Sequence, residues 1–343
     1  MNRAVSASGT VTEEGWFSRV RARQGLEMRI ALSSFIVAVA FLGTASLHLG
    51  HFDFQAICLA FLLRSYFLNF LCAVAGLIIL AAIAYYIRKE SDQDLVERYK
   101  LIAFFVPSMM LVNLVYFTLK AGSVAFNSNL GIITHEYAIW NFLRPVFAGL
   151  PRWGYHFLDI IYTGVWFTSL SALPLSLILL EPKKATRLNS AVMLLLAFTA
   201  LGNVFFLTLS PVYEFQKYFS YLPQTLSTWK IHHASFLLSH NLVNMKTALF
   251  SGRSAGFFQP VAAFPAFHSG YAFLLFLAFK DRRPPARRAL RLGEYLRYVL
   301  FVFWFVIVSG GIVLGYHGFL DTGVATIAAT VFFPKPKNYE NPA

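Results

Sequence analysis

The feature that most constrains the fold of this chain is its series of long apolar segments, separated by shorter polar ones. A membrane-spanning helix needs about 20 mostly apolar residues. The segments predict an all-α polytopic membrane protein with about eight transmembrane helices. We place them at 29–49, 67–87, 99–119, 155–180, 189–209, 267–280, 295–316 and 318–333.

The composition supports this interpretation. A soluble domain has roughly 25% charged residues, whereas this chain has 13% charged and 57% hydrophobic residues. These values exclude a soluble globular enzyme, a disordered chain and a fibrous repeat. Cys58 and Cys72 both lie in apolar surroundings, so they indicate neither a disulfide framework nor a zinc site.

The basic residues indicate how the spans are oriented. The formal net charge is +13, and the cytoplasmic loops of membrane proteins collect lysine and arginine. With the N-terminus inside, most of the 29 lysines and arginines fall in inner segments, particularly in 280–297. This distribution predicts that both termini are cytoplasmic, and it accounts for the positive charge without a nucleic-acid partner.

The spans divide the chain into four parts. Residues 1–28 form a cytoplasmic segment that is too long and too polar to be a cleaved signal peptide. Residues 29–98 hold two accessory transmembrane helices, and residues 99–333 form the main membrane domain. Residues 334–343 form a cytoplasmic tail.

The histidines gather on one side of the predicted membrane. All nine fall on or near the outer side: His48, His51, His135, His156, His232, His233, His240, His268 and His317. Because histidine titrates near neutral pH, we expect any acid–base chemistry at the outer face, covered by segments 120–153 and 210–266. His232, His233 and His240 match no zinc signature, so we expect no metal and no other cofactor.

Two short motifs are candidates for this chemistry. Phe264-Pro265-Ala266-Phe267-His268-Ser269-Gly270 places a histidine in the opening turn of a helix, where free backbone N–H groups attract anions. Gly315-Tyr316-His317-Gly318-Phe319-Leu320-Asp321 places a histidine and a carboxylate four residues apart, on one helix face. Each motif also has a structural interpretation, either an interfacial histidine or a hydrogen bond between packed helices. The topology places both histidines at the same depth.

Together the two motifs resemble the second and third motifs of the type 2 phosphatidic acid phosphatase superfamily. They are most similar to those of its inositol phosphorylceramide synthase-like branch. The resemblance covers roughly residues 99–333 and implies a six-helix catalytic core that transfers phosphate without a metal. It implies that His317 attacks phosphorus to form a phosphohistidine and that Asp321 orients it. It also implies that His268 protonates the leaving alcohol and deprotonates the incoming one.

Three positions differ from the family pattern. The pattern has lysine where this chain has Tyr137, arginine where it has Gly311, and serine where it has Ala266. Because two of the usual phosphate-binding cations are absent, the chain favours a reaction other than plain phosphomonoester hydrolysis.

Other outer residues are candidates for substrate binding. Arg144, Lys246 and Arg253, together with the backbone at Gly270, are the predicted phosphate-binding residues; Arg144 matches a motif position. His156 and Asp159 could form a second polar pair or make hydrogen bonds between helices. Tyr213 lies in a segment that loosely resembles one of the sphingolipid branch. We assign these last three residues to the substrate cavity.

The expected partners are a membrane lipid donor and a hydroxyl acceptor, either a lipid or a sugar. The resemblance favours transfer of a phosphate-containing headgroup at the extracytoplasmic or lumenal face of a bacterial inner membrane or a eukaryotic endomembrane. The alternative is a phosphatase acting on a lipid phosphate or a polyprenyl pyrophosphate. A lipid transporter or scramblase is the third interpretation, although the chain lacks the paired halves that many transporters show.

Overall fold

The computed structural model describes residues 136–166, 182–206, 208–214, 216–226, 261–262, 264–280 and 289–333, with isolated positions within 29–40, 100–116 and 169–178. Most of these residues are helical, and the strands among them are one pair of two residues each, so the described part agrees with the expected all-α class. The predicted segments 1–28 and 334–343, and nearly all of 29–98, lie outside the described residues.

The described elements follow one another along the chain in this order. They are helices α5 (Tyr137–Ala148) and α6 (Arg152–Ile160), the π-helical turn η2 (Ile161–Val165), helix α8 (Pro182–Phe205), strand β1 (Thr208–Leu209), helix α9 (Pro211–Glu214), the 3₁₀ turn η3 (Gln216–Phe219), strand β2 (Val261–Ala262), and helices α12 (Phe267–Lys280), α13 (Ala289–Val313) and α14 (Phe319–Phe332). Strands β1 and β2 are antiparallel and connect the end of α8 to the start of α12.

The predicted spans match some of these helices better than others. Helices α12 and α14 agree with 267–280 and 318–333 to within a residue. Helices α8 and α13 begin several residues before the predicted spans, because lysine and arginine favour a helix although they are not apolar. Helix α13 ends before Gly315, whose φ of +73° breaks the helix.

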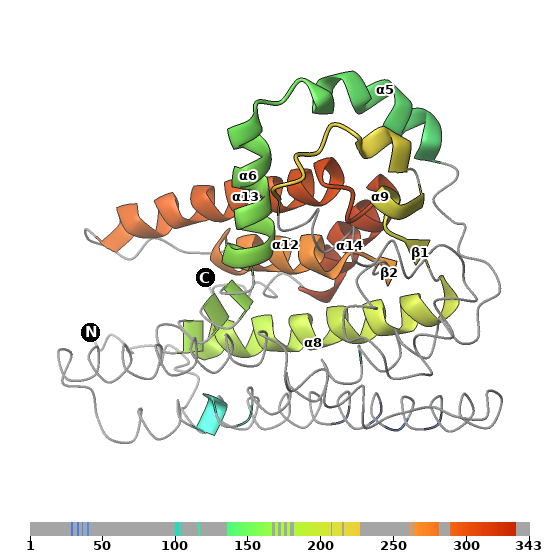
Figure 1. The fold of residues 1–343 in the computed structure, drawn as a ribbon. Helices are drawn as coiled ribbons and strands as arrows, with labels where there is room; N and C mark the ends of the chain where they lie inside the picture. Colours follow the sequence, from blue (N-terminus) through green and yellow to red (C-terminus); the bar gives the residue numbers. More distant parts are fainter. Residues whose placement is uncertain are drawn as a thin grey trace, which may run out of the picture.

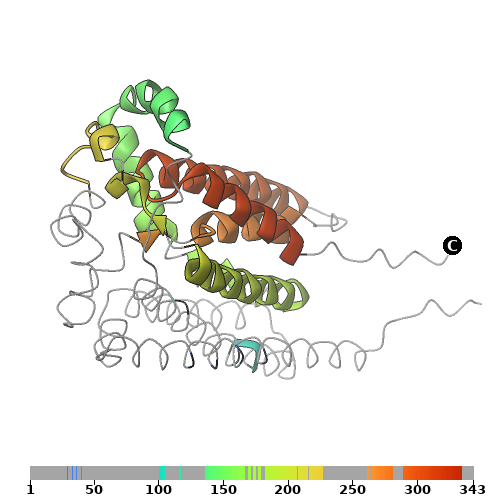
Figure 2. The ribbon, with the colours of Figure 1, turned by 90° about the vertical axis from the view of Figure 1, so that its right-hand side faces the viewer.

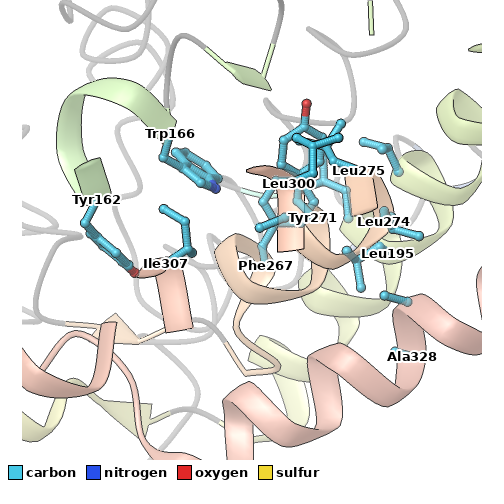
Figure 3. Packing of buried hydrophobic residues seen from close by; sticks show 14 of the residues in the cluster. Tyr162, Trp166, Leu195, Phe267, Tyr271, Leu274, Leu275, Leu300, Ile307 and Ala328 are labelled. Carbon is cyan, nitrogen blue, oxygen red and sulfur yellow. The ribbon is translucent and has the colours of Figure 1, made fainter. Parts of the chain in front are cut away.

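Helix α12 is the central helix of the described part. It packs against α8, α13 and α14, and Figures 1 and 2 show it between α8 on one side and α13 and α14 on the other. Its buried residues Tyr271, Leu274 and Leu275 belong to one hydrophobic cluster with Leu195 of α8 and Ala328 of α14 (Figure 3). The residues at the start of α12 are therefore held by the core of the molecule.

Two of the described helices are long and apolar enough to cross a membrane. Lys184–Phe205 has 22 residues with a mean hydropathy of 1.7, and Leu296–Val313 has 18 residues with a mean hydropathy of 2.1. At about 1.5 Å per residue, helices of these lengths match a hydrocarbon core of about 30 Å. Phe267–Phe279 and Phe319–Phe332 are apolar but shorter.

Large apolar side chains also lie on the outside of the described helices. On α13 they include Val299, Val302 and Phe305, and on α14 they include Ile327 and Val331, each more than half exposed. A surface of this kind is unusual for a protein surrounded by water, where large exposed apolar patches mark interaction sites. The described helices thus have an apolar interior and an apolar exterior, as helices do in lipid.

Candidate active site

His317 and Asp321 form a buried pair at the start of α14. The Nδ1–H group of His317 donates a hydrogen bond to Oδ2 of Asp321 at 2.8 Å. The other carboxylate oxygen, Oδ1, accepts a hydrogen bond from the backbone N–H of Thr322 at 2.8 Å. Because the carboxylate fixes Nδ1 as the donor, Nε2 of His317 keeps its lone pair. This nitrogen can therefore act as a base or as a nucleophile.

The turn between α13 and α14 positions His317. The backbone N–H groups of Tyr316 and His317 both donate to the carbonyl oxygen of Gly311, at 2.8 and 3.0 Å. Gly315 adopts a positive φ, and a Cβ atom there would lie 2.7 Å from the side chain of Val212. The backbone N–H of Val212 also donates to the Gly315 carbonyl at 3.1 Å. Only glycine satisfies both the conformation and the packing of this turn.

His268 is the second residue of α12, and the turn before it is bound on two sides. The backbone N–H of Ala266 donates to the carbonyl oxygen of Asp321 at 3.0 Å. The backbone N–H of Phe264 donates to Oδ1 of Asn203, near the end of α8, at 3.0 Å. The turn that leads into His268 is thereby attached both to α14 and to α8.

The two histidines lie close together among aromatic rings. The centroids of the His268 and His317 rings are 5.5 Å apart. The His268 ring lies 3.8 Å from the Trp166 ring and 4.9 Å from the Tyr162 ring, with which it is stacked. Tyr162 stacks in turn on Tyr316 at 4.6 Å. This arrangement brings together His268, His317 and Asp321, the three residues that the sequence predicts to be catalytic.

Glu136 supports the pair in a way that the sequence did not predict. Its two carboxylate oxygens accept hydrogen bonds from the backbone N–H groups of Phe319 and Leu320, at 2.9 and 2.5 Å, in the first turn of α14. A carboxylate at this position satisfies two free N–H groups and complements the helix dipole. No local spacing signals this contact, because 183 residues separate Glu136 from Phe319.

Of the three predicted phosphate-binding cations, the structure describes only Arg144. Arg144 lies on α5, is exposed, and donates from Nε to the carbonyl oxygen of Tyr218 at 3.3 Å and from Nη2 to Oγ of Ser220 at 3.2 Å. Lys246 and Arg253 lie outside the described residues. Phosphate binding by these three side chains stays a prediction.

Gly270 has a clear structural role in addition to the predicted one. A Cβ atom at this position would lie 2.9 Å from the carbonyl oxygen of Ala325 in α14 and 2.9 Å from Cδ2 of Leu195 in α8. The absence of a side chain lets α12 approach both neighbours closely, as small residues do between membrane helices. The backbone N–H of Gly270 donates to the Ala266 carbonyl at 3.2 Å. Its contact with phosphate stays a prediction.

The predicted cavity residues are spread over two elements. His156 and Asp159 lie on α6, where Nε2 of His156 is 3.3 Å from Oγ1 of Thr225 and Asp159 is buried. The backbone of Tyr213 lies in α9, and its side chain is outside the described residues. Their contact with a substrate stays a prediction.

Tyr221 lies in the segment that follows η3 and bonds it to α13. Its hydroxyl donates to the carbonyl oxygen of Val313 at 2.8 Å, where α13 ends. Burial raises the pKa of Tyr221, the nearby Tyr155 raises it further, and Arg144 opposes both effects. The phenol therefore stays protonated at neutral pH and remains a donor that links the segment after η3 to α13.

Within the described ranges, no group of three or more histidine, cysteine, aspartate or glutamate side chains could hold a metal ion. The histidines at 232, 233 and 240 lie outside those ranges.

The chain matches no model of a known protein family, no curated protein and no solved structure. Its function must therefore be argued from the residues themselves.

Proposed function

We propose that this chain is a membrane phosphotransferase that resembles the inositol phosphorylceramide synthase-like branch of the type 2 phosphatidic acid phosphatase superfamily. In this proposal it moves a phosphate-containing headgroup between lipids. The observation that supports it best is the pairing of His317 with Asp321, with the ring of His268 5.5 Å away. A fixed nucleophile beside a second proton-transferring group is the arrangement that two-step transfer requires.

The reaction follows from the roles of these groups. Nε2 of His317 attacks phosphorus, the bond from phosphorus to the leaving lipid oxygen breaks, and that oxygen takes a proton from His268. The acceptor hydroxyl then gives its proton to His268 and attacks the phosphohistidine, and the nitrogen–phosphorus bond breaks. His317 and His268 return to their starting states, and Asp321 holds the His317 tautomer throughout.

The surroundings of the pair favour transfer over hydrolysis. His317 and Asp321 are buried, and the rings of Trp166, Tyr162 and Tyr316 lie around the two histidines. An enclosed aromatic site disfavours water as the attacking group and accommodates an amphiphilic alcohol. Hydrolysis of a lipid phosphate or a polyprenyl pyrophosphate is the alternative within the same chemistry.

Membrane insertion is part of the proposal. Two described helices can cross a membrane by length and hydropathy, and large apolar side chains cover the outside of α13 and α14. We propose that these belong to a bundle of about eight transmembrane helices with a six-helix catalytic core and cytoplasmic termini. The histidine pair then lies at the extracytoplasmic or lumenal face, where a lipid donor and a hydroxyl acceptor can reach it.

The test compares the wild-type protein with the His317→Ala variant, both purified in lipid nanodiscs. The substrate is phosphatidylinositol labelled on phosphorus, offered with and without ceramide, and a labelled lipid phosphate is assayed separately. We expect a labelled product that requires ceramide, together with an acid-labile label on the wild-type protein, and neither in the variant. His48→Ala serves as the matched control, because it removes a histidine that the sequence places outside the predicted catalytic domain at 99–333.

Each other result has a definite meaning. Label released without ceramide, and lost in the His317→Ala variant, would make the protein a hydrolase. A folded His317→Ala variant with undiminished turnover would exclude the phosphohistidine. A protein that turns over neither substrate but moves labelled lipid between leaflets would support the transporter or scramblase interpretation.

A further inference from the structure

Tyr162 is a buried residue beside the two histidines, and its hydroxyl has no role in the mechanism above. Its ring stacks on His268 at 4.9 Å and on Tyr316 at 4.6 Å, and it lies 6.5 Å from the His317 ring. Only 3% of its surface is exposed. Its ring therefore lies against both histidines and the turn that positions one of them.

The hydroxyl of Tyr162 is buried and has no hydrogen-bond partner among the described residues. Buried polar groups in folded proteins nearly always have a partner, because an unpaired one is costly. Tyr271, another buried tyrosine, satisfies this rule, since its hydroxyl donates to the Ser169 carbonyl at 2.8 Å. Several other buried polar atoms among the described residues also have no hydrogen-bond partner, but the Tyr162 hydroxyl belongs to a ring that lies beside both histidines, which suggests that its partner arrives with a ligand.

The hydroxyl of Tyr162 lies close to Gly311 of α13. A Cβ atom at Gly311 would lie 3.7 Å from Oη of Tyr162 and 3.6 Å from Cδ2 of His317. Cδ2 is bonded to Nε2, the nitrogen that Asp321 leaves with its lone pair. The Tyr162 hydroxyl and the reactive edge of His317 therefore border the same space, which no side chain of residue 311 fills.

The backbone around Tyr162 is also irregular. Tyr162 lies in the π-helical turn η2, in which the backbone N–H of Trp166 donates to the carbonyl oxygen of Ile161, five residues earlier. Figure 3 shows the rings of Tyr162 and Trp166 projecting from this segment on the same side, toward Ile307 of α13. Single π-helical turns occur frequently at functional sites, because the extra residue redirects side chains.

We propose that the Tyr162 hydroxyl is a catalytic hydrogen-bond donor to a non-bridging oxygen of the phosphate during transfer. This inference rests on the proposed function and sharpens its substrate class. A neutral donor suits a phosphodiester, which bears one negative charge, better than a phosphomonoester, which bears up to two and needs more cations in an apolar site. The site is therefore built for a lipid phosphodiester donor.

The experiment uses Tyr162→Phe, with Tyr271→Phe as the matched control, in the full-length protein in nanodiscs. We expect Tyr162→Phe to lower kcat for transfer from phosphatidylinositol about 100-fold, as the loss of one transition-state donor does, with little change in KM. Orthovanadate adopts the five-coordinate geometry of phosphoryl transfer, so its affinity, measured by thermal stabilisation, should fall by a similar factor. The melting temperature without vanadate should stay equal or rise, because an unpaired buried hydroxyl is removed.

Tyr271→Phe should give the opposite pattern. Its melting temperature should fall, because the hydroxyl that donates to the Ser169 carbonyl is lost, whereas kcat and vanadate affinity should stay near normal, because we propose no contact between this hydroxyl and the phosphate. If Tyr162→Phe transfers phosphate and binds vanadate at wild-type levels, the inference about Tyr162 is overturned. An inactive His317→Ala variant in the same experiment would leave the proposed function standing. A Tyr162→Phe variant that is less stable but binds vanadate normally would reduce Tyr162 to a packing residue. If His317→Ala is fully active, both proposals fail together.

Discussion

Helices α12 and α14 both begin next to a histidine of the candidate site, but their first turns are held by different kinds of contact. At α14, two carboxylates hold the first turn. Asp321 accepts a hydrogen bond from His317, and Glu136 accepts hydrogen bonds from two backbone N–H groups. At α12, the neutral side chain of Asn203 and a backbone carbonyl hold the turn before His268, whose ring lies among aromatic rings.

This difference matches the different tasks that we propose for the two histidines. A nucleophile must keep one tautomer, and a carboxylate on Nδ1 enforces it. A group that both gives and takes a proton must be stable in either charge state. Aromatic faces hold a neutral imidazole by stacking and an imidazolium by cation–π attraction, so they place His268 without fixing its protonation state.

The largest expected effect comes from Asp321→Asn. The amide oxygen should take over the bond from the Thr322 N–H, so that the amide nitrogen faces Nδ1 of His317. This reverses the tautomer and places the proton on Nε2, so we expect transfer to fall about 10²- to 10⁴-fold. The decrease in the transfer rate is measured with the phosphorus-labelled lipid donor at a saturating concentration.

Thr322→Val is the control for this variant. It keeps the backbone N–H that binds Asp321 and removes a buried hydroxyl that has no partner among the residues the structure describes. Transfer should stay near the wild-type rate. Equal losses in the two variants would show that packing around α14, and not the tautomer, limits the reaction.

The next largest effect is expected from Gly270→Ala, which tests the packing of α12. The new methyl group would meet the Ala325 carbonyl and Leu195 at 2.9 Å, and overpacking of this kind costs about 1–3 kcal/mol of stability. The resulting shift of α12 should also lower transfer. Thermal unfolding followed by circular dichroism in detergent measures the loss of stability.

Gly323→Ala provides the comparison on α14. A Cβ atom there has nothing within 4 Å among the described atoms. Replacing a helical glycine with alanine in open space stabilises by about 0.5–1 kcal/mol. If the two variants are equally stable, α12 is not packed as closely as the described contacts require.

A smaller effect is expected from Glu136→Ala on the α14 side. Two N–H groups in the first turn of α14 lose their acceptor, and the loss of a helix cap costs about 0.5–2 kcal/mol. Glu136→Gln keeps one acceptor oxygen, so we expect roughly half of that loss. Chemical denaturation of the wild-type protein, Glu136→Ala and Glu136→Gln ranks their stabilities. If Glu136→Gln is the least stable of the three, the capping role is contradicted.

The smallest effect is expected from Asn203→Ala, which removes the acceptor for the Phe264 N–H. We expect a loss of about 1 kcal/mol and a several-fold lower rate, because the turn before His268 becomes less well fixed. Asn189→Ala is the matched control on the same helix, where Oδ1 has no partner within the described ranges. Its rate should stay close to the wild-type rate, and an equal decrease in both variants would assign the effect to α8 as a whole.

Part of this structure was predictable from the sequence, because it depends on contacts between residues that are near one another in the chain. The bounds of α12 and α14 follow from apolar runs bordered by polar residues. His317 and Asp321 do form the hydrogen bond that their spacing suggested, but the expectation that they share a helix face was wrong, because His317 lies in the turn before α14 begins at Phe319. Counting the predicted spans placed His268 and His317 at one depth, since an even number of crossings returns a chain to the same side, but the 5.5 Å between their rings was not predictable in this way.

The tertiary structure alone decided the contacts that join distant parts of the chain. The cap that Glu136 provides to α14, the bond from Asn203 to the turn before His268, and the packing of Gly270 between two helices have no local sequence signal. The position of Tyr162 depends on a π-helical turn and on a missing side chain at Gly311, on another helix. Periodicity and spacing record which face a residue occupies within its own helix, whereas the neighbours of that face are set by how the helices pack.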